Sequence, residues 1–330
     1  AAILSERIEA HTFNGSSAIK VITVEDPPEN AIKFTTQVPV VRSRKLEEGE
    51  SPFSPYIRAA MRSDPDVLMV GEVRDKASAE LLMTAVQSGP AVITTIHAPS
   101  AIGIMARLRS NVMGLPNDVL GGRDFISALV YQTLVPLVCT HCHLDYDEFK
   151  NSYDDRRSQQ LLKRIEKITS DEQRKHIRFK NYNGCEHCNE GKKGRIVIAE
   201  TIRPNDDMKK LFSQGKDFEA LQYFYTSGGK PILYYGFMRM LEGICDPRDI
   251  EHKVGRLHAD KVFEHEYIEQ KVAENGHQTI TDGVQPSGGD YAFRSKLLGE
   301  SNHKAEIKQL ELVKRDDKKE NNDNNDQTTE

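Results

Sequence analysis

Three short apolar runs near the start of the chain each end in acidic residues or a histidine. Glu25 and Asp26 follow the run Ile19–Val24, Glu72 follows Val67–Val70, and His97 follows Ala91–Thr95. Apolar runs of this length, separated by helical patterns, predict the buried strands of a mostly parallel sheet with helices on both faces. Sheets of this kind bind ligands at the carboxyl ends of their strands, which is where these side chains would gather. The fold class that we expect is therefore α/β.

The composition narrows the class of protein. The 330 residues carry 45 basic and 50 acidic side chains, a net charge of −5, which argues against a broad nucleic-acid-binding surface. The longest apolar runs, such as Leu134–Val138, are too short to cross a bilayer, and no secretory signal opens the chain at Ala1. We therefore expect a cytoplasmic protein. Five cysteines are too few for a disulfide scaffold in a chain of this length.

Local patterns predict the remaining elements. Helices are expected at Ile3–Ile8, Pro55–Arg62, Ala77–Ser88, Ser100–Leu108, Phe125–Leu134 and Leu161–Ile168, and short strands near Thr35–Val41 and at Ile196–Ile198. Residues 205–254 favour small helices. Strong periodicity ends near Gly255, although Ile307–Val313 fits a last helix, and residues 318–330 contain no apolar side chain. We therefore predict a largely disordered polar tail over residues 256–330.

The carboxylates at the predicted sheet edge suit nucleotide hydrolysis. Glu72, at the end of a strand and beside Gly71, can orient a water for attack on a γ-phosphate. Glu25 and Asp26 offer the hard oxygen ligands that Mg²⁺ prefers. Taken singly, each has a simpler interpretation: Glu72 is a solvated acid paired with Arg74, and the other two form an ordinary acidic turn. The three segments together favour the catalytic interpretation.

A histidine and two arginines complete the candidate nucleotide site. His97 can donate a hydrogen bond to a γ-phosphate, or it can be a helix-entry histidine bonded to the backbone. Arg58 and Arg62 lie four residues apart on a predicted helix and share one face, from which they can reach phosphate oxygens of their own subunit or a neighbour's. Alternatively, they form salt bridges with Asp64 or Asp66.

Two C-x-x-C pairs form the second strong signal. Cys139 and Cys142 make the first pair, and Cys185 and Cys188 make the second. Four thiolates in two such pairs are the tetrahedral ligand set that Zn²⁺ prefers, and a metal here would close an inserted element of residues 139–200. The alternatives are free, buried or redox-active cysteines, or replacement of one cysteine by a nearby histidine. Those histidines are His141, His143 and His187.

These motifs resemble those of the ATPases of type II secretion and type IV pilus assembly, within the secretion-ATPase superfamily. The resemblance runs from about Ala1 to Gly255. Its most specific stretch, Arg58–Asp75, is similar to that family's Walker B region. Ile22–Glu29 is similar to its Asp box, Thr94–Ala98 to its His box, and the two cysteine pairs with Gly191, Gly194, Arg195 and Glu200 to its zinc-bearing C-terminal element. That element is typical of members that assemble pili or export proteins.

The resemblance implies a RecA-like P-loop NTPase core over residues 1–138, incomplete at its N-terminus. A tetracysteine zinc-binding element (residues 139–200) and a C-terminal helical subdomain (residues 201–255) would follow. It implies ATP, Mg²⁺ and Zn²⁺ as cofactors. The catalytic residues would be Glu72, Glu25, Asp26 and His97, and the nucleotide-binding residues Glu72, Asp26, Arg58 and Arg62. The expected assembly is a homo-hexameric ring at the cytoplasmic face of the inner membrane, acting on a membrane platform protein. No direct nucleic-acid partner is expected.

The sequence departs from the family pattern in the phosphate-binding loop. No G-x-x-x-x-G-K-S/T occurs in the 330 residues, and the first residues fit the tail of the helix that would follow such a loop. Without that loop's backbone N–H groups and lysine, we expect the chain alone to bind ATP weakly and to hydrolyse it negligibly. Pro55 and Thr133 stand where the family pattern has arginines, which weakens an arginine-finger role at those positions.

Two other functions stay open. The chain can be a non-hydrolysing assembly or regulatory module of the same ring, although Glu72, Asp26 and His97 together argue against that role. A zinc-ribbon nucleic-acid binder is disfavoured because the net charge is acidic and aromatic and basic residues do not alternate near the cysteines.

Overall fold

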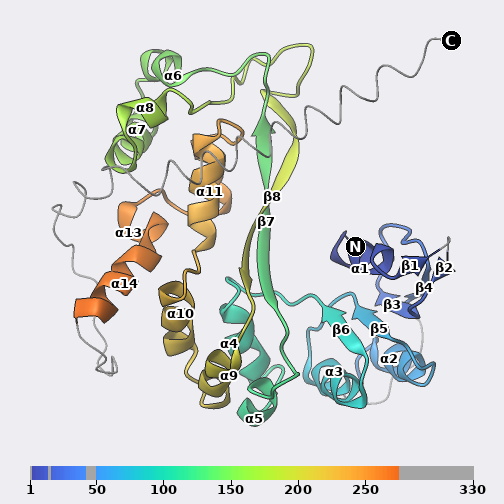
Figure 1. Ribbon diagram of the computed structural model, residues 1–330. Coiled ribbons are helices and arrows are strands. Elements are labelled where there is room, and N and C mark those ends of the chain that lie inside the picture. The colour runs from blue at the N-terminus through green and yellow to red at the C-terminus, as the bar shows by residue number, and fades with distance from the viewer. Residues whose placement is uncertain (1, 14–15, 42–49, 275–330) are drawn as a thin grey trace. The chain divides into compact units, whose positions relative to one another are not determined.

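The computed structural model describes residues 2–13, 16–41 and 50–274, and these contain a four-stranded parallel sheet (Figure 1). Strands β3 (Val21–Glu25), β4 (Thr35–Pro39), β5 (Val67–Val70) and β6 (Ala91–Thr94) lie in the order β4-β3-β5-β6. Each pairing is parallel, with Val24 opposite Val70 and Val70 opposite Thr94. The predicted α/β class with a parallel sheet is confirmed.

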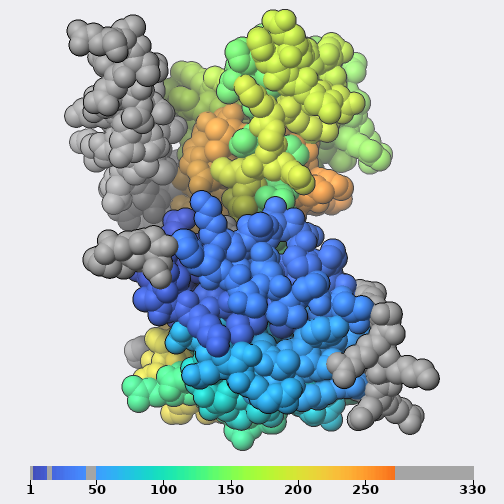
Figure 2. Space-filling model, turned by 90° about the vertical axis from the view of Figure 1, so that its right-hand side faces the viewer, coloured from blue at the N-terminus to red at the C-terminus, as the bar shows by residue number. Residues whose placement is uncertain are grey.

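Helices cover both faces of this sheet because its strands are apolar on both sides. Leu4 and Ile8 of α1 (Ala2–Glu9) pack with Val21 and Val67 on one face. Helices α2 (Ser54–Met61) and α3 (Lys76–Ser88) pack against the other face, which carries Ile22, Val24, Leu68 and Val70, and α4 (Gly103–Arg109) contributes to the same core cluster. The segment from α1 to β4, coloured dark blue, is exposed on the face of the molecule that Figure 2 turns to the viewer.

Local capping signals explain where these helices begin and end. Asp75 Oδ1 accepts a hydrogen bond from Ser78 N at 2.8 Å at the start of α3, and Gly89, with a φ of +122°, ends the helix. Ser100 Oγ accepts a hydrogen bond from Gly103 N at 3.1 Å before α4, as the sequence predicts. The short elements in this part are β1 (Thr12–Phe13), β2 (Ser16–Ser17) and α5 (Asn117–Leu120).

A long antiparallel ribbon stands where the sequence predicts a helix at Phe125–Leu134. Strand β7 runs from Leu129 to Val138 and pairs with β8 (Lys192–Ile202), of which the predicted strand Ile196–Ile198 is only the middle. The helix prediction is wrong because the partner strand is distant in sequence, and the ladder it forms outweighs the local helical spacing. A register shift between Pro136 and Val138 interrupts the ladder at the end nearest Cys139.

Three capped helices occupy residues 146–174, where spacing predicts only one. They are α6 (Tyr146–Ser152), α7 (Arg156–Ile168) and α8 (Asp171–Arg174). Asp145 and Ser170 each form a capping box, with Glu148 and Gln173 respectively, and Asp155 caps α7. The prediction missed α6 and α8 because capping signals, rather than a long apolar stripe, define these short helices.

Small helices follow, as predicted for residues 205–254, and they divide between two core clusters. They are α9 (Asp206–Ser213), α10 (Asp217–Thr226), α11 (Ile232–Leu241) and α12 (Pro247–Lys253). Phe212 of α9 and Ala220 of α10 belong to the cluster that contains the sheet residues. Phe237 of α11 and Ile250 of α12 belong to a second cluster, with Phe179. The ribbon contributes to both clusters, through Leu129 and Ile202 to the first and through Val135 and Ile198 to the second.

Helical structure continues past Gly255, where the predicted polar tail begins. Helix α13 spans Ala259–Val262 and α14 spans Glu264–Glu274. Leu257 and Val262 are fully buried in the second cluster, so a few apolar anchors fold this stretch without strong periodicity and correct the expectation of disorder here. The rest of the predicted tail, including the helix expected at Ile307–Val313, lies outside the described residues.

Among the helices of the described ranges, none is both long enough and apolar enough to span a membrane.

Candidate functional site

The carboxyl ends of three neighbouring strands lie together at one edge of the sheet. Glu25 ends β3, Gly71 and Glu72 follow β5, and Thr95 follows β6. Gly71 N donates a hydrogen bond to Val24 O at 2.8 Å, so the ladder continues into the loop. A Cβ added to Gly71 would lie 3.5 Å from Glu25 Cα, which means that these two strand ends are in direct contact.

The Glu25 side chain is oriented by two neutral donors. It is 9% exposed, and its Oε1 accepts hydrogen bonds from Thr23 Oγ1 at 2.7 Å and from Gln37 Nε2 at 3.0 Å. Within the described part of the chain no cation pairs with Glu25, so its charge is held in place without being neutralised. Asp26, the next residue, is half-buried.

Glu72 makes the ion pair that the simpler interpretation of the sequence proposed. Its Oε2 lies 2.6 Å from Arg74 Nη2, and the side chains are 20% and 61% exposed, respectively. A pair this open to solvent contributes about 0–1 kcal/mol, so little free energy opposes an exchange of partners. The pair therefore restrains the Glu72 carboxylate only weakly.

The histidine and the arginines lie at the surface. His97 follows β6, is exposed, and has no hydrogen-bond partner among the described residues, so the backbone bond considered as an alternative does not form. Arg58 pairs with Glu50, and Arg62 is exposed. The alternative salt bridges to Asp64 or Asp66 are not found in the described ranges.

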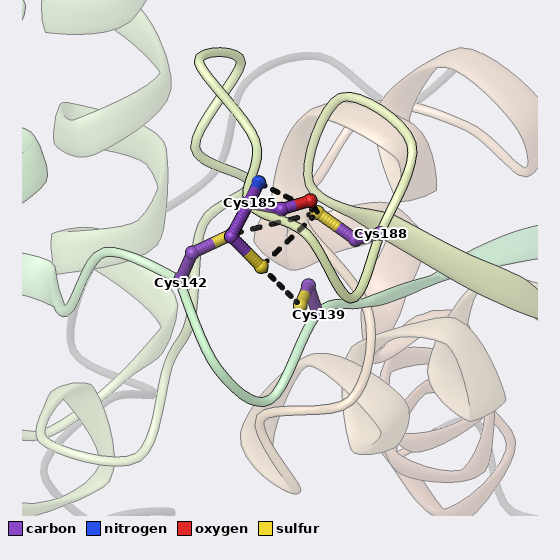
Figure 3. A group of neighbouring side chains, drawn as sticks. All are labelled: Cys139, Cys142, Cys185 and Cys188. Atoms are coloured by element: carbon purple, nitrogen blue, oxygen red, sulfur yellow. Dashed lines mark hydrogen bonds between the residues drawn. The ribbon is translucent and has the colours of Figure 1, made fainter.

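The four cysteines of the two C-x-x-C pairs converge from opposite ends of the ribbon loop (Figure 3). Cys139 and Cys142 follow β7, and Cys185 and Cys188 precede β8. The Sγ–Sγ distance is 3.8 Å between Cys139 and Cys185, and 3.6 Å from Cys188 to both Cys142 and Cys185. All four sulfurs lie within 4.8 Å of one another, an arrangement that can hold a metal ion.

Glycines and backbone amides shape this cluster. Gly191 has a φ of +75°, and its O accepts a hydrogen bond from Cys139 N at 2.9 Å, which links the two pairs. His141 N donates to Cys139 Sγ at 3.4 Å, and Cys185 N donates to Cys188 Sγ at 3.3 Å. The hydrogen bond from the His141 backbone outweighs the effect of burial and lowers the pKa of Cys139 to about 7. The lowered pKa favours the thiolate form.

The neighbouring histidines lie beside the cluster. The rings of His141 and His187 are 4.2 Å apart, and His143 Nδ1 lies 3.2 Å from Cys139 O. The group of side chains that could share a metal contains only the four cysteines, among the residues that the structure describes. The structure therefore gives no support to a histidine as a replacement ligand.

A buried charge network, which sequence reasoning missed, supports the second cysteine pair. Asp246 is fully buried and accepts hydrogen bonds from Lys180 N at 2.7 Å and from Arg248 Nη2 at 2.6 Å. The Arg248 guanidinium lies 4.7 Å from the centroid of the Tyr182 ring and 4.9 Å from that of Phe149. The segment that leads into Cys185 is thus anchored from α12. The sequence signals only the helix start at Asp246-Pro247, because the partners of Asp246 are distant in sequence.

A family model and individual relatives of this chain point to the same family. A family model described as "Type II/IV secretion system protein" matches residues 8–252. The type IV pilus assembly ATPase PilB of Pseudomonas aeruginosa is 29% identical over 235 residues, covering 70% of this chain and 38% of the relative. The type II secretion system ATPase E of Vibrio cholerae is 27% identical over 239 residues, covering 71% and 42%. The chain thus spans about two fifths of the length of these curated relatives.

Two solved structures are also similar. The pilus retraction motor PilT with bound ADP aligns with a TM-score of 0.47 and 20% identity, covering 76% of this chain and 56% of that one. The ATPase DotB of Legionella pneumophila aligns with a TM-score of 0.48 and 20% identity, covering 76% and 55%. Because the family model covers well over half of the sequence, this chain belongs to the family of type II/IV secretion system proteins.

Proposed function

We propose that this chain is part of an ATP-hydrolysing motor subunit of a type IV pilus assembly or type II secretion machine, which drives pilin polymerisation or export. One observation carries the proposal: the carboxyl ends of β3, β5 and β6 meet at one sheet edge, and the candidate acids and histidine follow them. The relatives PilB and ATPase E are named as ATPases of pilus assembly and type II secretion, which supports it.

The side chains at this edge suit distinct roles in nucleotide hydrolysis. Glu72 would orient the attacking water, since its surface pair with Arg74 costs little to open. Glu25 and Asp26 would hold Mg²⁺ through carboxylate oxygens, and Glu25 is already oriented by neutral donors. His97 is free to donate a hydrogen bond to a γ-phosphate.

The two arginines would contribute positive charge to the nucleotide site. Arg58 and Arg62 lie at the exposed side of α2 and the turn after it, where they can reach phosphate oxygens of bound ATP. Arg58 must first release Glu50, and that pair is also open to solvent, with 46% of the Arg58 side chain exposed.

We infer that the phosphate cradle comes from residues outside the 330. The chain has no G-x-x-x-x-G-K-S/T, which elsewhere supplies the backbone N–H groups and the lysine that bind phosphate. Strand β6 is at the edge of the sheet that the structure describes, and its residues Ala91–Thr94, the first three of them apolar, are all half-exposed. An apolar edge of this kind calls for a further strand. The 330-residue chain alone would therefore bind ATP weakly and turn it over negligibly.

The tetracysteine cluster would hold a structural Zn²⁺. With Zn–S bonds of about 2.3 Å, a tetrahedral site has Sγ–Sγ distances of about 3.8 Å. Three of the six Sγ–Sγ distances are 3.6 to 3.8 Å, close to that value, and all six are within 4.8 Å. A bound metal would join the turn after β7 to the turn before β8 and so close the element of residues 139–200.

The remaining proposals concern assembly. We infer a homo-hexameric ring, peripheral at the cytoplasmic face of the inner membrane and acting on a membrane platform protein. The family membership and the relatives' names support a place in a pilus or secretion machine. Sedimentation of the protein purified from its host, with and without ATP, would test the ring. A species that stays monomeric under both conditions would contradict it.

The activity is tested on the protein purified from its host, whatever its length there. Glu72→Gln should lower kcat of magnesium-dependent ATP hydrolysis by about 100-fold or more, because it removes the group that orients the water. Arg74→Gln is the matched control, since it opens the same ion pair but keeps the carboxylate. Equal activity of wild type and Glu72→Gln would contradict the catalytic role. Clear turnover by the purified 330-residue chain would contradict the inference about the phosphate cradle.

The metal is tested by its stoichiometry. We expect about one zinc per chain, lost when Cys139 and Cys185 are replaced by serine. Cys245→Ala is the control, because Cys245 is also buried but lies outside the cluster. Zinc content at the level of a buffer blank would contradict the site.

A non-hydrolysing assembly or regulatory module of the same ring is the second candidate function. The absence of G-x-x-x-x-G-K-S/T from the 330 residues is the observation that this function would explain. This function predicts ring formation by the host protein with no ATP turnover in wild type, so the same assay separates the two candidates.

A further inference from the structure

A pocket outside the sheet edge has a volume of about 420 Å³ and is formed by segments far apart in sequence. Ile102 of the α4 entry, Leu221 of α10 and Ile232 of α11 provide apolar walls. Glu200 of β8, Tyr225 of α10 and Glu264 of α14 provide the polar groups. In Figure 1, α10, α11 and α14 lie on the same side of the β7–β8 ribbon.

Glu200 is the buried polar group of this pocket. It is 4% exposed, and its Oε2 accepts a hydrogen bond from Ile232 N at 3.1 Å. No ion pair neutralises it within the described part of the chain. Burial raises the pKa of the Glu200 carboxyl, and the backbone N–H groups of Ile232 and Ala101 oppose that rise. A carboxylate can accept about four hydrogen bonds, so acceptor capacity is left over.

A hydroxyl, that of Tyr225, and a second carboxyl group, that of Glu264, line the same pocket. Tyr225 is 3% exposed and lines the pocket, and no hydrogen bond of its hydroxyl is found in the described ranges. Burial raises the pKa of Tyr225, and the charges of Glu264 and Glu200 raise it further, so both carboxylates act on this hydroxyl. The polar groups inside the pocket are therefore two carboxyl groups, Glu200 and Glu264, and the neutral hydroxyl of Tyr225, which can both donate and accept.

The cations of the pocket lie at its rim. Arg256 and Lys261 line it but are exposed, and Lys261 Nζ is already 3.7 Å from Glu264 Oε1. A ligand that reaches the buried part meets Glu200 and Tyr225, surrounded by aliphatic side chains. Such a site recognises a hydrogen-bond donor with positive charge on an apolar stem.

We propose that this pocket binds an alkylguanidinium or alkylammonium group, with the charged end at Glu200 and the stem against Leu221 and Ile232. The group can be the side chain of a partner protein or a free amine, since both present the same chemistry. The pocket volume is sufficient for either, because sites for small ligands begin at about 300 Å³.

Binding of hexylguanidinium to the 330-residue chain, measured by titration calorimetry at pH 8, tests the proposal. The neutral isostere hexylurea and the anion hexanoate are the matched probes. We expect saturable binding of hexylguanidinium and at least about tenfold weaker binding of the other two, since a charge-assisted hydrogen bond is lost. Hexylurea or hexanoate binding as tightly as hexylguanidinium, or no saturable binding of hexylguanidinium, would overturn the proposal.

Variants locate the binding. Glu200→Gln keeps an acceptor for Ile232 N and should weaken hexylguanidinium binding by about tenfold, whereas Glu80→Gln, an exposed residue of α3, should leave it unchanged. If circular dichroism shows that Glu200→Gln does not fold, Glu264→Gln decides, because Glu264 lies closer to the surface. Unchanged binding by the folded variant would overturn the assignment to this pocket.

A binding experiment with two peptides distinguishes a partner's side chain from a free small molecule as the ligand. Acetyl-Leu-Arg-Leu-amide is compared with the same peptide carrying citrulline, the neutral isostere of arginine. Tighter binding of the arginine peptide than of hexylguanidinium supports a partner's side chain as the natural ligand. Binding of hexylguanidinium alone supports a free amine, and binding of neither refutes the site.

Discussion

Gly191 lies where a side chain has almost no room, so Gly191→Ala should destabilise the tetracysteine element strongly. Its φ of +75° costs a residue with a Cβ about 1–2 kcal/mol. The added Cβ would also lie 2.6 Å from Asn181 O, well inside ordinary contact distance. Overpacking of this kind costs about 1–3 kcal/mol, which gives a total of about 2–5 kcal/mol.

Gly194→Ala is the matched control for this prediction. Gly194 has a similar φ of +82°, but its Cβ would meet only Leu137 Cδ1, at 3.8 Å. The conformational cost is therefore the same, and the clash is absent. Urea-induced unfolding followed by circular dichroism should show Gly191→Ala less stable than Gly194→Ala by at least about 1 kcal/mol.

The clash should also reach the metal site. Asn181 O accepts a hydrogen bond from Gly184 N at 3.0 Å, so a displaced Asn181 moves the turn that precedes Cys185. Gly191→Ala should therefore retain less zinc than Gly194→Ala after dialysis against a weak chelator. Equal stability and equal metal content of the two variants would refute the reasoning.

Three further predictions follow from burial and capping. Burial, and then Lys230, lower the pKa of His265 to about 4, below the unfolded value of about 6.5. Between these pH values the unfolded chain binds more protons than the folded one, so acidification from pH 6.5 to 4 should lower the free energy of unfolding by about 3 kcal/mol. In urea titrations, His265→Phe should remove this loss. His252→Phe, at an exposed position, should not. Asp75→Ala removes the acceptor for Ser78 N and should lower the free energy of unfolding by about 1 kcal/mol, with Asp75→Asn close to wild type in the same assay. Arg248→Lys loses the contacts with the Tyr182 and Phe149 rings and part of the hydrogen bonding to Asp246, and should lower the free energy of unfolding by about 1–3 kcal/mol. A melting temperature within error of wild type would contradict a stabilising role of these contacts.

The parallel sheet could be predicted from sequence because its strands are locally encoded. Val67–Val70 and Ala91–Thr94 are short apolar runs with helix patterns on either side, and no distant partner is needed to recognise them. The ribbon could not be predicted in this way. Leu129–Val138 becomes a strand because β8 pairs with it across the cysteine element, and local spacing carries no information about that partner.

The candidate site divides in the same manner. That Glu25 and Glu72 lie at one edge follows from strand ends in a parallel sheet. The two C-x-x-C pairs predict a shared metal site, but the pairing of β7 with β8 is what brings Cys139 and Cys185 into one cluster. The partner choices depend on side-chain positions that only the fold defines. Examples are the ion pair of Arg58 with Glu50, where the sequence suggested Asp64 or Asp66, and the contact of the Arg248 guanidinium with the Tyr182 ring.

The β7–β8 ribbon connects the two core clusters over a long distance. At a rise of about 3.3 Å per residue, its arm is about 30 Å long, with one end in the core cluster of the sheet and the other at Cys139. A tilt of about 5° at Leu129 would therefore displace the cysteine turns by about 3 Å. The register shift between Pro136 and Val138 interrupts the regular pairing near that end. A change of orientation at the sheet would thus produce a larger displacement at the cysteine cluster, because the ribbon is long.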